Sequence, residues 1–406
     1  MGGQISGMNT KILSAGKLSV LFMLTYMVSY LTRNNYSGIV VEMVSATGFS
    51  KAELSVALTA NAVTYALGQI IIGFLGDRIQ PKRLVTFGLS VTAIMNLAIP
   101  FCAAPWQMAI IWSINGFAQA FMWPPMVKLM VSCFNEKEYN RGSVLVSYGS
   151  STGTVLIFLL SPLVIALGTW KWVFWGAACC SIVAIAAWNL WCPLLTDLPT
   201  PEKKQETATG TFRVTPLLVV IMVAIMIHGA LRDGVTTWTP SYISEIYHLG
   251  TDTAIFSSVL LPIFAMVCHG ITGVLYHKYL RSPVLCSGVL FVAATAAATG
   301  LYFLTGNAAV PSVLCIAVLT GCMHGINLML ICIVPRFYRN TGKVSFVSGL
   351  LNASAYAGSA ISTYGVALLT ERAGWNVTIL VWGAIALLGA ALCIGSIPGW
   401  SRKMKA

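Results

Sequence analysis

Two arginines, Arg33 and Arg232, stand inside stretches of the chain that are otherwise apolar. A guanidinium keeps its proton in proteins and offers five N–H donors in a planar fork, which fits the oxygens of a phosphate or a carboxylate. The two residues lie 199 positions apart. If their stretches are helical, each arginine lies about 22 to 24 Å from the start of its helix. Two forks at equal depth predict an anion-binding site, and they suit a doubly charged phosphate best.

The neighbours of these arginines extend the predicted site. Tyr26 and Tyr30 precede Arg33 by seven and three residues, so the three side chains share one helical face. Their hydroxyls are expected to bind the anion, and the alternative is an ordinary packing role. Asp233 is the one obvious acidic residue inside the apolar stretches, but consecutive residues point about 100° apart on a helix. We therefore expect Asp233 to be a poor partner for Arg232.

The composition indicates the solvent around these residues. The 406-residue chain is 57% hydrophobic and 9% charged, whereas soluble domains carry about 25% charged residues. A helix needs about 20 apolar residues to cross a bilayer. A lone charge deep in the bilayer costs about 2.5 to 3.5 kcal/mol, so each arginine must face a polar cavity or a partner. Twelve stretches have the required length: 18–41, 52–75, 84–102, 106–131, 143–167, 172–192, 216–240, 253–276, 283–305, 310–334, 344–370 and 376–398.

The distribution of the positive charge, net +12, indicates how the chain is oriented in the membrane. Eighteen of the 24 lysines and arginines fall in the two terminal segments and in loops on one side of the predicted membrane. This asymmetry is the positive-inside signal, so we expect no binding of nucleic acid. It predicts a multi-pass protein of the cell (inner) membrane, with both termini in the cytoplasm.

The chain divides into two related halves. Segment 193–214 is the only long polar stretch, and we expect it to be a cytoplasmic linker between a six-helix bundle at 1–192 and a second at 215–406. The sequence GFLGDR begins at Gly73 and GVLYHK begins at Gly273, an offset of 200 that nearly equals the offset of the arginines. The sequence therefore predicts an all-α membrane protein of twelve transmembrane helices in two pseudo-symmetric bundles.

Other chemistry finds little support. The eleven cysteines lie mostly inside apolar stretches without the spacing of a metal site. We find no nucleophile arrangement, paired carboxylates or Walker-type loop. We expect no metal, no cofactor and no enzymatic activity.

Four segments carry a resemblance to known transporters. GQIIIGFLGDRIQPKRLVTFG, at 68–88, is similar to the loop motif of the major facilitator superfamily. YLTRNNYSG, AQAFMWPPMVKLM and LRDGVTTWTPSYISE resemble the organophosphate:phosphate antiporter family, which includes glycerol-3-phosphate and hexose-phosphate transporters. The resemblance implies that Arg33 and Arg232 bind the phosphate of the substrate, and that transport is a rocker-switch exchange.

The chain also departs from this family. Gln69 stands where the family usually has a lysine in the second span, and Thr152 where the glycerol-3-phosphate branch has a histidine. The predicted site is therefore less cationic than that of the family. The resemblance places His324 and Tyr356 at substrate-facing positions, and the alternative for His324 is a buried packing role. We include all four in the predicted substrate site.

Asp77 ends the second span. A negative charge is unfavourable at a helix C-terminus, so this carboxylate needs cations or the N-terminus of another helix nearby. The resemblance implies a latch that holds the two halves in an outward-open state, formed by Gly73, Asp77, Arg78, Lys82, Arg83 and Arg141.

The leading hypothesis is a monomeric secondary transporter that exchanges a phosphorylated organic metabolite for inorganic phosphate. One alternative is a carboxylate or sugar-acid transporter of the same fold with proton or sodium coupling, for which Asp233 is the candidate coupling residue. Another is a sensor that binds its ligand without moving it. The expected partners are a small anionic metabolite, inorganic phosphate and the lipid bilayer.

Overall fold

The computed structural model describes residues 14–197, 214–248 and 251–405, and the elements among these residues are all helical. The first half contains α1 (Ala15–Thr47), α2 (Lys51–Gly76), α3 (Pro81–Ala98), α4 (Pro105–Gln119), α5 (Trp123–Cys133), α6 (Glu136–Leu167) and α7 (Lys171–Trp191), with short turns η1 (Ile99–Phe101) and η2 (Leu195–Asp197). The second half contains α8 (Pro216–Tyr247), α9 (Thr251–Leu275), η3 (Tyr276–Leu280), α10 (Pro283–Leu304), α11 (Ala309–Ile326), η4 (Asn327–Ile333), η5 (Val334–Thr341), α12 (Val344–Gly395) and α13 (Ile397–Lys405).

Some of these helices combine into, or divide into, membrane spans. Helices α4 and α5 form one span with a break at 120–122, and α11 continues into η4 and η5. Helix α12 is two arms joined at Gly374, whose φ of 79° favours glycine. Nine helical stretches of the described residues are long and apolar enough to cross a membrane, and one of them includes both arms of α12. With α9 and the α4–α5 pair, they make the twelve transmembrane helices that the sequence predicts.

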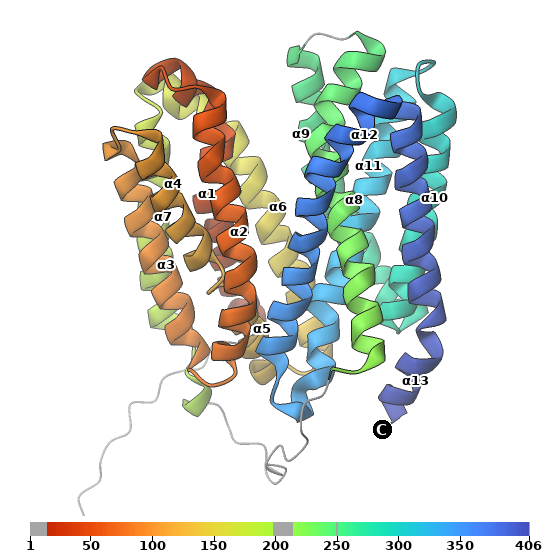
Figure 1. The fold of residues 1–406 in the computed structure, drawn as a ribbon. Coiled ribbons are helices and arrows are strands. Elements are labelled where there is room, and N and C mark those ends of the chain that lie inside the picture. Colours follow the sequence, from red (N-terminus) through yellow and green to blue (C-terminus); the bar gives the residue numbers. More distant parts are fainter. Residues whose placement is uncertain (1–13, 198–213, 249–250, 406) are drawn as a thin grey trace, which may run out of the picture.

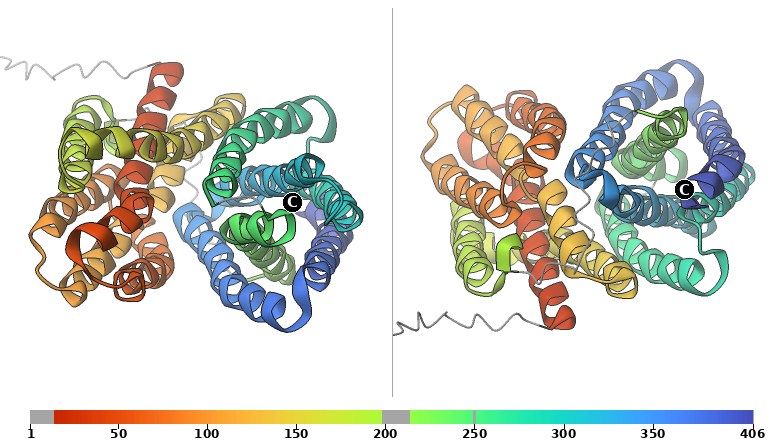
Figure 2. Two further views of the ribbon diagram at one scale, coloured as in Figure 1. Left: turned by 90° about the horizontal axis from the view of Figure 1, so that it is seen from above. Right: turned by 90° about the horizontal axis from the view of Figure 1, so that it is seen from below.

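The helices form two groups, α1–α7 and α8–α13, which stand side by side (Figures 1 and 2). The groups contact each other mainly through α2 with α12, α6 with α9, and α5 with α12. We call the end of the molecule that carries 76–83, 133–141, 276–283 and 334–343 the basic end. The ribbons approach each other there and diverge toward the opposite end (Figure 1). The division at 193–214 stays a prediction, because 198–213 lie outside the described residues.

Glycines bring the two arginine-bearing helices close to their neighbours. A Cβ atom on Gly153 of α6 would lie 2.5 Å from the carbonyl oxygen of Met27 on α1. A Cβ atom on Gly358 of α12 would lie 1.9 Å from the carbonyl oxygen of Met226 on α8. Met27 and Met226 are 199 residues apart, the offset that also separates the arginines. The same small-residue packing therefore recurs in both halves, which supports a duplicated unit.

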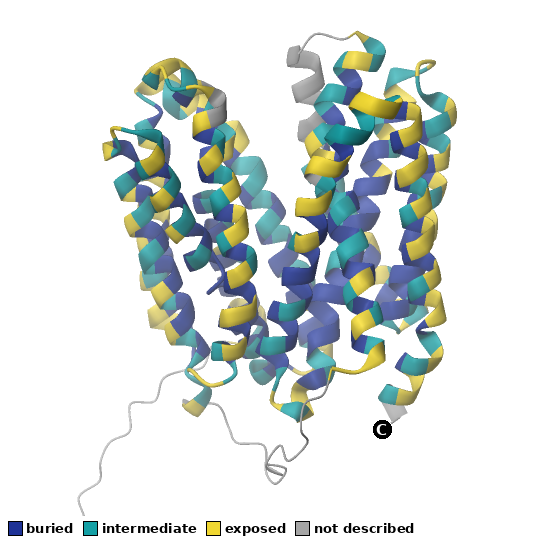
Figure 3. Cartoon of the chain, viewed as in Figure 1, coloured by how far each residue is buried: buried dark blue, intermediate teal, exposed yellow. Residues whose placement is uncertain are grey.

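The outer faces of both groups are apolar. Large hydrophobic side chains are exposed on many helices, among them Leu67, Val183, Leu190, Phe303 and Leu387. Buried residues concentrate inside each group and between the groups, while exposed residues follow the outside (Figure 3). Exposed apolar surface on this scale is unusual for a soluble monomer. It is the surface that lipid covers in a multi-pass membrane protein.

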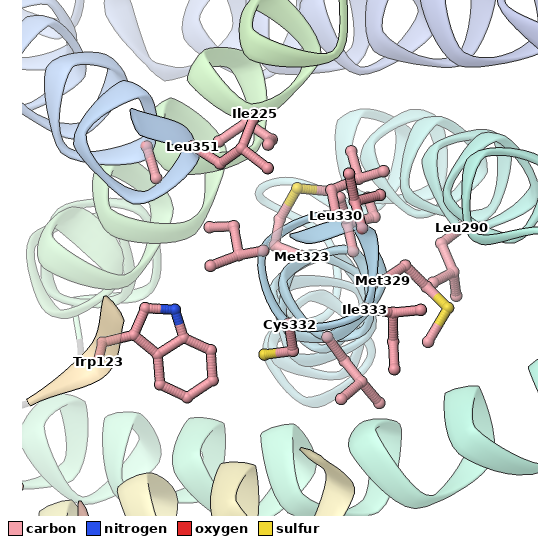
Figure 4. Close-up of a cluster of buried hydrophobic side chains, with 14 of the residues drawn as sticks. Trp123, Ile225, Leu290, Met323, Met329, Leu330, Cys332, Ile333 and Leu351 are labelled. Atoms are coloured by element: carbon pink, nitrogen blue, oxygen red, sulfur yellow. The ribbon is translucent and has the colours of Figure 1, made fainter. Parts of the chain in front are cut away.

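The largest buried cluster crosses from one group to the other near the basic end. Figure 4 shows Met323, Leu330 and Ile333 of α11 and η4 among the apolar side chains of the second group. Trp123, from α5 of the first group, lies on the side of η4 that carries Cys332 (Figure 4). This cluster closes the space between the groups on the side of the basic end.

The close approach of α8 and α12 predicts an asymmetric response to added methyl groups. Gly358→Ala forces α12 away from Met226, and overpacking of this kind costs about 1 to 3 kcal/mol or more. We expect a lower apparent Tm for the purified protein in detergent. Gly176→Ala on α7 is the control, because a Cβ atom there meets no atom within 4 Å. An equal Tm for both variants would contradict this packing.

Candidate anion-binding site

A cavity of about 380 Å³ lies between the two helix groups at the depth of the arginines. This volume lies within the usual range for small-ligand sites. The first group contributes polar lining residues Tyr30, Arg33, Asn34, Ser37, Asn61, Tyr65, Ser150, Ser151 and Thr154. The second group contributes Arg232, Asp233, Thr236, His269, His324, Asn327 and Tyr356.

The cavity is open on one side only. Ser37 and Thr236 lie about one helical turn beyond the arginines, away from the basic end, and both are exposed. On the other side lie Tyr26, Trp123 and Cys332, which are each less than a tenth exposed. A ligand can therefore reach the arginines from the end opposite the basic end.

Arg33 has no acidic partner. The two ion pairs found among the described residues, within 4.0 Å, do not include it. Its guanidinium carbon lies 4.2 Å from the ring centre of Tyr30 and 4.8 Å from that of Tyr65, and its Nη1 donates a hydrogen bond to the Tyr356 hydroxyl at 3.3 Å. Aromatic faces attract a cation but do not neutralise it. Arg33 therefore presents an uncompensated positive charge to the cavity.

Arg232 is paired, contrary to expectation. Its Nε and Nη2 donate to the two carboxylate oxygens of Asp233, at 2.6 and 2.8 Å. The Ser359 hydroxyl on α12 donates to the same carboxylate at 2.5 Å. The expectation that Asp233 is a poor partner is wrong, because it considered only where the Cβ atoms point. The arginine side chain is long enough to turn back and meet its neighbour with a bidentate fork.

Tyr356 links the two arginines. Its hydroxyl accepts the bond from Arg33, and its ring centre lies 5.8 Å from the guanidinium carbon of Arg232. Its ring also packs against Tyr65, with ring centres 4.6 Å apart. Tyr26 lies deeper, with its ring 5.1 Å from the rings of both Tyr30 and Trp123. It lines a smaller cavity of about 30 Å³ at the closed side of the first.

Two predicted site residues, Gln69 and Thr152, line neither of these cavities. Gln69 is fully buried where α2 meets α12, and its amide nitrogen and oxygen have no hydrogen-bond partner in the described part of the chain. Thr152 also lies off the cavity, whereas Ser151 and Thr154 of the same helix line it. Sequence resemblance locates a residue along a helix, but successive side chains point about 100° apart, so one position of error changes the face.

His324 lines the cavity, and a second histidine accompanies it. The ring of His269 on α9 lies 5.5 Å from that of His324, and its Nδ1 has no hydrogen-bond partner among the described residues. Asn327, at the start of the π-helical η4, also lines the cavity. The sequence analysis missed both of these residues. A polar side chain inside an apolar stretch was the available signal for each.

Asp77 holds the basic end through the N-terminus of a helix. Its two carboxylate oxygens accept from the backbone N–H groups of Ser345 and Phe346, at 2.9 and 3.0 Å, at the start of α12. A side chain on Gly73 would approach the carbonyl oxygen of Ser345 to 3.0 Å, so the glycine permits this contact. Burial raises the pKa of Asp77, and the two backbone hydrogen bonds oppose that rise. The structure shows both kinds of partner considered for Asp77. The helix N-terminus binds the carboxylate directly, and the nearby cations Lys128 and Lys343 also lower its pKa.

The four cations assigned to the latch do not pair with Asp77. Arg78 stacks on the Phe74 ring at 4.2 Å, and Lys82 donates to the carbonyl oxygen of Asn189. Neither Arg83 nor Arg141 forms an ion pair in the described ranges. A carboxylate whose oxygens already accept two N–H bonds has less need of cations.

Other residues join the halves at the basic end. Arg336, from η5, donates to the Glu136 carboxylate at 3.0 Å and to the Asn140 side chain at 2.9 Å, both on α6. The Tyr139 hydroxyl donates to the carbonyl oxygen of Cys332 at 2.5 Å. The sequence analysis did not select these residues, because Arg336 and Glu136 look like the other charged residues of the loops at this end.

Comparison with known proteins identifies the class. The family model of the Major Facilitator Superfamily matches residues 22–345, and the chain belongs to this superfamily. A solved structure of the proton:xylose symporter XylE aligns with a TM-score of 0.77 at 10% identity, covering 95% of this chain and 96% of that one. The chain is therefore a transporter-fold membrane protein and not an enzyme.

Sequence relatives narrow the assignment. The glycerol-3-phosphate transporter of Bacillus subtilis is 26% identical over 384 residues, covering 86% of this chain and 84% of that protein. A probable hexose phosphate transport protein of Chlamydia pneumoniae is 22% identical over 404 residues, covering 89% and 87%. These relatives support membership of the organophosphate:phosphate antiporter family.

The Asp77 contact predicts a shift between conformations. Asp77→Ala removes the acceptor of two N–H groups at the start of α12, and loss of such a cap costs about 0.5 to 2 kcal/mol. We expect the population that is open at the basic end to rise roughly 2- to 30-fold. Spin labels at positions 137 and 279, which are exposed on α6 and η3, would report it as longer distances in pulsed electron resonance. Arg78→Ala is the control and should leave the distances unchanged.

Proposed function

We propose that this protein exchanges a phosphorylated organic metabolite for inorganic phosphate across the cell membrane by rocker-switch alternating access. The observation that carries the proposal is the position of the arginines. Arg33 and Arg232 come from equivalent helices of the two halves and face one cavity, and no carboxylate of the described residues pairs with Arg33. The names of the relatives support a phosphate-bearing substrate.

In this mechanism the phosphate binds first at Arg33. The Tyr356 hydroxyl, which already accepts from Arg33, can donate its own proton to a phosphate oxygen. The free Nη1 of Arg232, which makes no hydrogen bond to another described residue, approaches from the second half. One anion held by both halves draws them together at the open end, because each half then gains contacts only in the closed arrangement.

Closure at the open end requires separation at the basic end. The contacts that must break there are those of Asp77 with α12 and of Arg336 with Glu136. Gln69 lies in the same α2–α12 contact. Separation of these helices exposes its amide to the substrate path, so the predicted role of Gln69 belongs to the inward-facing state.

The Arg232–Asp233 pair supports one alternative function, a carboxylate or sugar-acid transporter. It leaves the cavity with one uncompensated positive charge, which a carboxylate or sugar acid would also match. Ligand-induced thermal stabilisation separates the two substrates, since a ligand of the folded state raises its stability. Stabilisation by sugar acids alone, with none by sugar phosphates, would favour the carboxylate transporter.

The direct test of exchange is counterflow. Proteoliposomes loaded with inorganic phosphate should accumulate labelled phosphate from outside, and unloaded proteoliposomes should accumulate much less. Absence of uptake in folded protein would contradict the proposal. Ligand stabilisation without uptake in the same preparation would indicate a sensor.

The arginine forks predict the outcome of conservative variants. Arg33→Lys and Arg232→Lys each keep the charge but lose the planar fork. A hydrogen bond to a charged group contributes about 1.5 to 3 kcal/mol, so we expect the exchange rate at low substrate to fall roughly 10- to 150-fold. Arg372→Lys, at an exposed position in the second half, should exchange normally. Normal exchange in either cavity variant would place the site elsewhere.

A further inference from the structure

Asp233 is unexplained by anion binding alone. A carboxylate in a cavity that attracts anions repels the ligand, yet Asp233 lines this cavity. Its side chain is 33% exposed, so it is not sealed in the protein interior. The binding of an organophosphate, as proposed above, does not explain why Asp233 lies in the cavity.

The first half has an uncharged residue, Asn34, at the position equivalent to Asp233. Asn34 follows Arg33 as Asp233 follows Arg232, and the offset is again 199 residues. The Asn34 amide donates to the Thr154 hydroxyl at 3.0 Å, and the Ser359 hydroxyl donates to Asp233 at 2.5 Å. Thr154 and Ser359 each directly follow the glycine that packs on the arginine helix. The two sites are equivalent in position and differ by one negative charge.

The charged and titratable groups around Asp233 are few. On its own helix α8 they are Arg232 and, one turn earlier, His228. Helix α12 contributes Ser359 and Tyr356, α11 contributes His324, and α9 contributes His269 beyond it. From the first half, Arg33 and the tyrosines Tyr26, Tyr30 and Tyr65 face the cavities. With neutral histidines, two arginines and one carboxylate leave a net charge of +1.

We propose that Asp233 is a specificity-determining residue that makes the cavity select the singly charged form of a phosphorylated ligand. A single negative charge compensates Arg33 and leaves the Arg232–Asp233 pair intact. A doubly charged phosphate must either remain half compensated or take Arg232 from Asp233, which leaves that carboxylate without its partner. An uncompensated charge is costly once the cavity closes and excludes water. This inference rests on the proposed recognition of phosphate.

The proposal has a defined pH dependence. Phosphate monoesters lose their second proton with a pKa of about 6, so the singly charged fraction rises roughly 20-fold from about pH 7.5 to about pH 5.5. A sulfate monoester carries one charge throughout this range. Methyl phosphate and methyl sulfate therefore form a pair in which only the phosphate changes its charge.

The experiment measures how each ester inhibits exchange of labelled inorganic phosphate in proteoliposomes. The ratio of the two inhibition constants, phosphate over sulfate, cancels the effect of pH on the labelled phosphate and every effect on the protein that both esters share. For the unmodified protein, we expect this ratio to fall roughly 20-fold between about pH 7.5 and about pH 5.5. A ratio that stays constant or rises as the pH falls would overturn the proposal. So would exchange that neither ester inhibits.

Two variants assign the effect to Asp233. Asp233→Asn copies the amide that stands at the equivalent position of the first half and raises the net charge to +2, so the ratio should fall much less or rise. Asp233→Glu keeps the charge, and its ratio should fall as in the unmodified protein. Equal ratios in all three proteins would remove Asp233 from selectivity. Absence of phosphate exchange at every pH would instead contradict the proposed function, so the two failures are distinguishable.

Discussion

A guanidinium cannot escape its charge, and this constraint shapes the centre of the molecule. Arg33 lies deep in an apolar helix. It cannot lose its proton there, and no carboxylate in the described part of the chain compensates its charge. The surrounding structure supplies tyrosine rings, a hydroxyl and a cavity that opens toward one end. The halves therefore leave a cavity at this depth, where Tyr356 of the second half bridges to Arg33 and Tyr65 of the first. Further contacts between the halves lie at the basic end.

The duplicated backbone carries an asymmetric distribution of charge. Both arginine helices pack on a glycine of the fifth span of their half, and both place a polar side chain directly after the arginine. In the first half that side chain is a neutral amide, and in the second it is a carboxylate. The two halves thus present different electrostatic surfaces to one ligand. A bound anion meets a free cation on one wall and a neutral pair on the other.

The sequence predicted the features that depend on long patterns. Twelve apolar stretches, the offset between Arg33 and Arg232, and the position of Asp77 after the second span each survive small errors of register. The features that the sequence did not predict depend on which face of a helix a side chain occupies and on how far that side chain extends. Thr152 was predicted to line the cavity but does not, because an error of one residue changes the face of a helix. Asp233 was predicted to be a poor partner for Arg232, but the flexible arginine side chain turns back and pairs with it. Contacts such as that of Arg336 with Glu136 join segments 200 residues apart, and no local sequence pattern predicts them.

The contact between α2 and α12 encloses polar groups that lack hydrogen-bond partners. Gln69 is buried there with both ends of its amide unpartnered, and the hydroxyls of Ser345 and Ser348 on α12 are likewise unpartnered within the described residues. Each buried polar group left unpaired costs about 1 to 3 kcal/mol. Water would satisfy all three as soon as the helices part. The closed contact is thus held by the Asp77 cap and weakened by the unpaired groups in its own interior. In the exchange mechanism proposed above, these unpaired groups lower the binding free energy that an anion must supply to part the helices.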